Sequence, residues 1–233
     1  VNELSEDNAH TVTATVSSLD VLLGLGGKTV DFEVSGNNAA TANPGSGSSD
    51  TDDNGETTFS YDVPISCNSL GTDIIEGCTD RADGGEEFDA VTKDWVDTIP
   101  PVAQCVPTEN PHGDNDPNAP GEGGQGQNQD GFYELLAEDN LVEDCAPLDL
   151  WITDDGSGTV FGPFPVGTEI KYIQDPDAIP EIAPMGGNNG NGNGKSKDTD
   201  WRIKGTGDAV LTAVDQSGNV SDPVYCLVPP APQ

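Results

Sequence analysis

The chain is organised around the stretch WVDTIPPVAQC, residues 95–105. Pro100 and Pro101 lock φ at two successive positions, remove two backbone donors and push Ile99 towards extended geometry. The chain therefore leaves one strand stiffly and enters another. This stretch predicts a seam between two β modules, residues 1–97 and 98–233, and each module is long enough to bury a hydrophobic core of its own.

Before the seam, three runs alternate apolar and polar residues. They are TVTATV at 11–16, KTVDFEV at 28–34 and TTFSYDV at 57–63. A period of two residues predicts half-buried β-strands. Residues 35–53 are rich in Gly, Asn, Ser and Asp, which predicts a long surface loop. With 29 glycines, 18 prolines and little helical periodicity, the sequence indicates an all-β protein.

The composition is strongly acidic, with 42 Asp and Glu against 8 Lys and Arg and a net charge of -34. Such a chain repels phosphate backbones and anionic lipid surfaces, so we expect neither nucleic acid nor direct membrane insertion. Three explanations of the charge stay open: clustered carboxylates bind calcium, a saline habitat screens them, or they keep a surface protein soluble. Val1 is expected to be a mature or excised N-terminus.

Five cysteines, none of them in a Cys-x-x-Cys pair, predict structural disulfides and therefore an oxidising, extracellular compartment. Cys67 and Cys78 are close in sequence, and a local disulfide is their simplest pairing. A fully extended strand would hold them too far apart, so this pairing requires the segment after Cys67 to fold back. Cys145 is the odd cysteine: a free buried thiol, a residue that displaces one of the expected pairings, or a link to another chain.

The strand runs of the first module recur in a particular order. TVTATV at 11–16 is followed by KTVDFEV at 28–34, TDDNGETTFSY at 51–61, GTDII at 71–75 and AVTKDW at 90–95. This order resembles a bacterial Ig-like domain of the invasin/intimin type (Big-1). The resemblance implies a β-sandwich that serves as a spacer or adhesive unit of surface proteins, generally without catalysis.

The second module carries its own set of motifs. They are DTIPPVAQC at 97–105, AEDN at 137–140 with Cys145, FPVGTEIKY at 164–172 and AVDQSGNVS at 213–221 before Cys226. This order resembles the hyalin repeat (HYR), which implies a second Ig-like β-sandwich and a disulfide between Cys105 and Cys226. Two insertions, 109–130 and 174–200, are far longer than usual strand connections.

The segment NQDGFYE, residues 128–134, resembles the middle of a calcium loop, because alternating oxygen ligands on a Gly-turned segment can converge on one hard cation. A plain acidic turn is the alternative. As an EF-hand the segment fails, since neither Gly126 nor Ala137 supplies the required carboxylate. The candidate calcium ligands are Asp114, Asp116, Asn128, Asp130 and Glu134.

No catalytic motif stands out. His10 and His112 lack a second ligand at metal spacing, and neither Gly-x-Ser-x-Gly nor His-Glu-x-x-His occurs, so we expect no enzyme. We expect two consecutive Ig-like β-sandwiches in a secreted, non-catalytic structural or adhesive protein of the prokaryotic cell surface. It would be a subunit of a surface filament or a stalk segment of an adhesin.

The expected partners are copies of the same chain, neighbouring modules of the same surface protein, or a host, cell-surface or polysaccharide ligand. Strand edges or the N-terminal segment 1–4 would dock on a neighbour by strand addition. The alternative function is an accessory carbohydrate-binding module of a secreted enzyme. Its sugar-stacking platform would come from Trp95, Trp151 and Trp201.

Overall fold

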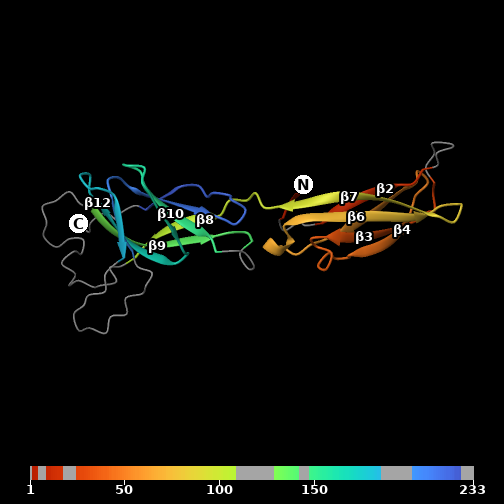
Figure 1. Ribbon diagram of the computed structural model, residues 1–233, viewed down its shortest axis with the longest axis horizontal. Helices are drawn as coiled ribbons and strands as arrows, with labels where there is room; N and C mark the ends of the chain where they lie inside the picture. Colours follow the sequence, from red (N-terminus) through yellow and green to blue (C-terminus); the bar gives the residue numbers. More distant parts are fainter. Residues whose placement is uncertain are drawn as a thin grey trace, which may run out of the picture. The chain divides into compact units, whose positions relative to one another are not determined.

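The computed structural model describes residues 2–4, 9–17, 25–108, 129–141, 147–184 and 201–226. The chain divides into two compact units (Figure 1). The first comprises Val1–Thr98 and Leu141–Cys145, and the second comprises Ile99–Asn140 and Ala146–Gln233. The boundary between Thr98 and Ile99 lies inside the seam at 95–105. The sequence did not indicate that Leu141, far along the chain, is buried in the core of the first unit.

Both units are built from β-strands, as the composition and the alternating runs predicted. In the described part of the chain, the only helical element is one short 3-10 turn, Cys67–Ser69. None of the described residues forms a helix long and apolar enough to cross a membrane.

The first unit is a sandwich of a five-stranded and a two-stranded sheet, in the orders β1-β7-β6-β3-β4 and β2-β5. Its strands are β1 (Asn2–Glu3), β2 (His10–Thr15), β3 (Thr29–Gly36), β4 (Ser46–Asp50), β5 (Glu56–Tyr61), β6 (Gly71–Asp80) and β7 (Glu86–Val96). The three alternating runs of the sequence form β2, β3 and β5, which confirms those predictions.

The core of the first unit lies between its two sheets. Val30, Phe32 and Val34 alternate along β3 and are buried, while the residues between them are exposed. Phe32 stacks on Phe59 of β5 with ring centroids 5.2 Å apart. The period of two therefore produces a half-buried sheet, with one face packed against the opposite sheet.

Two segments of the first unit differ from expectation. Residues 35–53 were predicted to be a loop, yet β4 forms within them as an antiparallel edge strand on β3. Its sequence SGSSD has no large apolar side chain, so the backbone ladder and not burial orders it. The N-terminal segment, expected to dock on a neighbour, pairs as β1 in parallel with β7 of its own unit.

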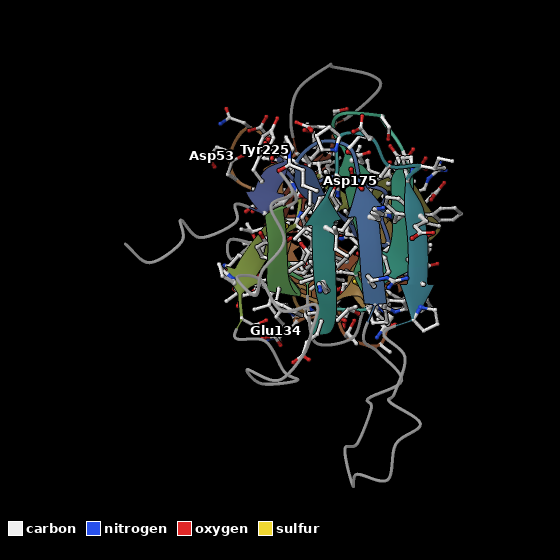
Figure 2. All side chains as sticks on the ribbon, turned by 90° about the vertical axis from the view of Figure 1, so that its left-hand side faces the viewer. Asp53, Glu134, Asp175 and Tyr225 are labelled. Carbon is white, nitrogen blue, oxygen red and sulfur yellow. A yellow bond between two sulfur atoms is a disulfide. The ribbon has the colours of Figure 1, made fainter. Side chains whose placement is uncertain are left out.

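The second unit is a sandwich of a four-stranded and a five-stranded sheet, in the orders β11-β10-β15-β16 and β13-β14-β12-β9-β8 (Figure 2). Its strands are β8 (Val102–Pro107), β9 (Gln129–Glu138), β10 (Asp149–Asp154), β11 (Val160–Phe164), β12 (Thr168–Gln174), β13 (Glu181–Pro184), β14 (Trp201–Gly205), β15 (Ala209–Val214) and β16 (Val224–Cys226).

Fully buried aliphatic and aromatic side chains from both sheets fill the second core, among them Tyr133, Leu150 and Leu211. The central pair β10 and β15 is antiparallel, whereas β12 and β14 are parallel. The insertion predicted at 174–200 contains the short edge strand β13, which pairs with β14. An edge strand needs hydrogen-bond partners on one side only, so even this short, largely exposed segment is ordered by its ladder.

Candidate functional site

The first unit holds a buried polar group of five residues, called here the Asp73 cluster: Asn38, Tyr61, Asp73, Lys93 and Trp95. Its centre is the carboxylate of Asp73 on β6, which is fully buried. Oδ1 accepts hydrogen bonds from the backbone N–H of Asn38 at 2.8 Å and from its Nδ2 at 3.1 Å. Oδ2 accepts from Tyr61 Oη at 3.0 Å and from Trp95 Nε1 at 2.8 Å. These donors satisfy a carboxylate without access to water.

Strand register explains how these residues meet. Asp73 lies opposite Lys93 on β7 and opposite Gly36 at the end of β3, so β6 carries Asp73 between the two neighbouring strands. Trp95 follows Lys93 by two positions and therefore faces the same side of the sheet. Asn38 lies just beyond β3, where the chain turns over β6. The carboxylate of Asp73 consequently receives donors from β7 and from the turn after β3.

Lys93 is the unusual member of the Asp73 cluster. Its side chain is buried, and its Nζ lies 4.4 Å from the centroid of the Trp95 ring. Among the described residues, Nζ has no hydrogen-bond partner. Burial lowers the pKa of the amine, while the nearby charges of Asp94 and Asp73 act in the opposite direction. A buried amine without an acceptor is costly, so this group calls for an explanation.

Aromatic rings pack around Trp95, whose face lies against the amine. Tyr61 and Trp95 meet edge to face with centroids 6.2 Å apart, and His10 packs edge-on against Tyr61 at 5.8 Å. Burial is the main cause that lowers the pKa of His10, and the charge of Lys93 adds to it. Burial and the adjacent charge of Asp73 raise the pKa of Tyr61 well above its ordinary value. The rings thus exclude water from the amine and from the carboxylate.

The second unit has a comparable buried carboxylate, Asp154 at the end of β10. It accepts hydrogen bonds from Ser157 Oγ at 2.5 Å, from the backbone N–H of Thr206 at 2.9 Å and from that of Gly207 at 2.6 Å. Burial by itself would raise the pKa of Asp154, but these hydrogen bonds outweigh it and lower the pKa to about 2. Asp154 therefore fastens the turn after β10 to the turn after β14.

The disulfide framework agrees with one prediction and corrects another. Cys105 on β8 and Cys226 on β16 are bonded, with Cα atoms 5.4 Å apart, as the hyalin-repeat resemblance implied. The predicted pairing of Cys67 with Cys78 is wrong, because Cys78 is a free thiol. Strand β6 runs straight from Gly71 to Asp80, which carries Cys78 away from Cys67 instead of folding back. Cys67 is disulfide-bonded, but to none of the three cysteines just named, and Cys145 lies outside the described residues.

The predicted calcium ligands are only partly visible. Asp114, Asp116 and Asn128 lie outside the described residues. Asp130 belongs to β9, and its side chain is not described. Glu134 is half-buried on β9 opposite Glu169, and Figure 2 shows it at the end of the sheet away from Asp175. Whether these five residues bind calcium stays a prediction.

Two acidic side chains of the same unit, Asp139 and Asp215, also lie close together. Carboxylate oxygens of Asp139 and Asp215, from the AEDN and AVDQSGNVS motifs, lie within 4.8 Å of each other. Burial raises the pKa of Asp139, and the negative charge of Asp215 adds to this effect. Asp215 also accepts hydrogen bonds from Asn219, which fixes its orientation. Carboxylates at this separation can ligate one calcium ion together.

The tryptophans do not form the platform that a sugar would need. Trp95 is buried in the first unit, and Trp201 packs against the second core, tilted against Phe164. Trp151 is half-buried on β10, in the sheet opposite to that of Trp201. Among the described residues, the exposed large aromatics are Phe88 and Tyr225, and they belong to different units. The stacked pairs found in the described part are core pairs such as Phe32 with Phe59.

Sequence reasoning missed the Asp73 cluster. The signal that could have found it is the alternation of buried and exposed positions along each strand. Lys93 lies two residues before buried Trp95, and Asp73 lies two residues before buried Ile75, so both charged residues are on the inward face. A charged residue on the inward face of a strand is a candidate for a special role. No comparable signal marks Asn38, which lies beyond the end of a strand.

No family model matches this chain, and a search of curated proteins finds no match. Among solved structures, invasin, a bacterial integrin-binding protein, is 15% identical to this chain with a TM-score of 0.40. The match covers 99% of this chain and 38% of the invasin chain. The chain thus spans less than half the length of that protein. The fibronectin(III)-like modules of Clostridium thermocellum CbhA are 13% identical with a TM-score of 0.28, covering 96% and 85%. A tetra-tandem repeat from the extending region of a large adhesion protein is 14% identical with a TM-score of 0.34, covering 95% and 50%.

Proposed function

We propose that this chain is a non-catalytic, load-bearing element of the prokaryotic cell surface, a subunit of an adhesive fibre or a stalk segment of an adhesin. The observation that carries this proposal is the position of the disulfide between Cys105 and Cys226. Among the described strands of the second unit, β8 is the first and β16 the last along the chain, and this disulfide joins the two.

Tension along the chain would therefore pass through a covalent bond. The disulfide closes a loop with a sequence separation of 121, which contains every other strand of the second unit. A force that pulls on the two ends can extend only the short segments outside this loop. The sandwich itself carries almost none of the load while the disulfide is intact.

The first unit resists tension in a different way. Its terminal strands β1 and β7 are parallel, with Asn2 opposite Trp95 and Glu3 opposite Val96. The next bond of the same ladder runs from the N–H of Leu4 to the carbonyl of Val96 at 2.9 Å. Pulling the start of β1 and the end of β7 apart acts along the strands. The ladder bonds are then loaded together and not one after another.

The charged surface fits an exported protein. A net charge of -34 keeps a crowded surface protein soluble and prevents non-specific association. If calcium binds the acidic groups of the second unit, assembly would also depend on that cation. In the fibre version, β4 and β13, which are edge strands among the described residues, would offer backbone groups for strand addition between copies.

The test is immunogold labelling of intact cells that produce the protein. We expect label on extracellular fibres or on stalks at the cell surface, and label confined to the cell interior would contradict the proposal. Sedimentation of protein released from the cells separates the two versions. The fibre version predicts concentration-dependent assembly, whereas the stalk version predicts a monomer at every concentration and calcium level.

A further inference from the structure

The amine of Lys93 is the one feature of the Asp73 cluster that packing does not explain. Lys93 is 2% exposed, and its Nζ has no hydrogen-bond acceptor among the described residues. The face of Trp95 stabilises a cation but does not replace the lost water. A buried lysine whose ammonium form is disfavoured holds an uncharged amine more readily, and an uncharged amine is a nucleophile.

An electrophile with a suitable leaving group lies on the other side of Asp73. The side chain of Asn38 is 1% exposed. Its Nδ2 lies 3.1 Å and 3.2 Å from the two carboxylate oxygens of Asp73, and it also donates to the carbonyl of Ser69 at 3.0 Å. The carboxamide is therefore held in one position, with its amino group against a carboxylate that can supply or accept a proton.

The spacing of the strands allows the two side chains to meet. Asn38 follows β3, and its backbone N–H donates to Asp73 on β6, which lies directly opposite Lys93 on β7. An extended lysine side chain reaches about 6 Å from its Cα and the asparagine carboxamide carbon about 2.5 Å, so the two can meet across one inter-strand spacing of about 5 Å. Nζ already lies over the indole whose N–H donates to Asp73.

We propose that Lys93 and Asn38 form an intramolecular amide bond, with Asp73 as the proton-transfer group. The lone pair of neutral Nζ attacks Cγ of Asn38, and Nζ passes a proton to the carboxylate of Asp73. The Cγ–Nδ2 bond then breaks, Asp73 returns a proton to Nδ2, and ammonia leaves. One C–N bond forms and one breaks, so the reaction needs no oxidant, cofactor or second protein.

The product accounts for the unpartnered amine. The buried amine becomes a neutral amide nitrogen, so no charge remains without a partner. The new bond joins the turn after β3 to β7 and closes a loop across the five-stranded sheet. This inference stands on the geometry of the first unit and does not depend on the proposed function. A permanent cross-link beside the terminal strand β7 would nevertheless add to the resistance of that unit to tension.

The test is the intact mass of the full chain after denaturation, reduction and alkylation of the cysteines. We expect a mass lower by about 17 Da than the sequence requires, because one ammonia is lost. Tandem mass spectrometry should find the peptides that contain Asn38 and Lys93 joined. The full sequence mass, with Lys93 labelled by an amine reagent after unfolding, would overturn the proposal. A loss of about 18 Da would overturn the role of Asn38, since it would mean loss of water and an amide to Asp73.

Two variants serve as controls. Succinimide formation at Asn-Gly sequences, of which Asn54-Gly55 is one, also releases ammonia, so Lys93→Met must restore the full mass if the assignment is right. A mass loss that persists in Lys93→Met would refute it. Asp73→Asn should leave the bond unformed. Asp94→Asn, at a half-buried position beside Lys93 on β7 whose carboxylate accepts from Thr72, should still allow the bond to form.

Thermal unfolding of Lys93→Met separates a cross-linked Lys93 from a free one, because the two predict shifts of the unfolding midpoint in opposite directions. If Lys93 is cross-linked, Lys93→Met removes a covalent loop closure, and the midpoint of the first unit should fall by on the order of 10 °C or more. If Lys93 is a free buried amine, exchange for a methionine of similar shape removes an unsatisfied polar group and should leave the midpoint unchanged or raise it. An unchanged or raised midpoint contradicts the cross-link.

Discussion

Loss of the disulfide between Cys105 and Cys226 should destabilise the second unit strongly. The bond closes a loop with a sequence separation of 121. In the chain-entropy description, closing a loop of that length lowers the entropy of the unfolded chain enough to contribute about 5 kcal/mol to the free energy of unfolding. For a domain of this size that amounts to a fall in the unfolding midpoint of about 20 °C.

The assay is calorimetry of the full chain carrying Cys105→Ala and Cys226→Ala together. A double variant is preferable to a reducing agent, because Cys67 is also disulfide-bonded and would be reduced as well. Cys78→Ala is the matched control, since Cys78 is a free thiol and its exchange should leave both transitions unchanged. A loss below about 1 kcal/mol in the double variant would refute the argument from loop closure.

Three further outcomes follow from the described sites. Asp154 has a folded pKa of about 2 against 3.8 unfolded, so it should contribute about 2 kcal/mol to the stability of the second unit above pH 4. Urea titrations should show that this contribution disappears as the pH falls from 4 to 2. The pH dependence should be absent in Asp154→Asn and retained in Asp177→Asn, which changes an exposed residue. Calcium at 100 times its Kd should stabilise the second unit by about 2.7 kcal/mol, and Asp139→Asn should reduce the effect; a shift that sodium chloride reproduces would argue against a site. Non-reducing peptide mapping should join Cys67 to Cys145, the cysteine left once the others are assigned, and a free Cys67 thiol would contradict this.

Much of the fold could be predicted from the alternation of residue types. The runs at 11–16, 28–34 and 57–63 fall on β2, β3 and β5, since a buried face imposes a period of two on a strand. The edge strands β4 and β13 could not be predicted in this way. Their order comes from backbone hydrogen bonds to a neighbouring strand, and their side chains carry little apolar area that would mark them.

The candidate sites were less accessible to prediction. The pairing of Cys105 with Cys226 followed from a resemblance, because nothing local indicates which of five cysteines meet. The pairing of Cys67 with Cys78 failed because closeness in sequence is not closeness in space once a straight strand intervenes. The Asp73 cluster joins Asn38, in the turn after β3, to Asp73 on β6 and Lys93 on β7, and only strand register brings such distant positions together.

The most direct test of the load-bearing account is extension of single molecules held at their two ends. Wild-type protein with its disulfides intact should show unfolding of the first unit but no lengthening from the loop between Cys105 and Cys226. In a Cys67→Ala background, which removes the second disulfide from the comparison, the variant without Cys105 and Cys226 should release that loop. With a sequence separation of 121, this is about 400 Å of additional length at a moderate force. If the wild-type chain releases the same length as the variant, the disulfide does not carry the tension and the account is wrong.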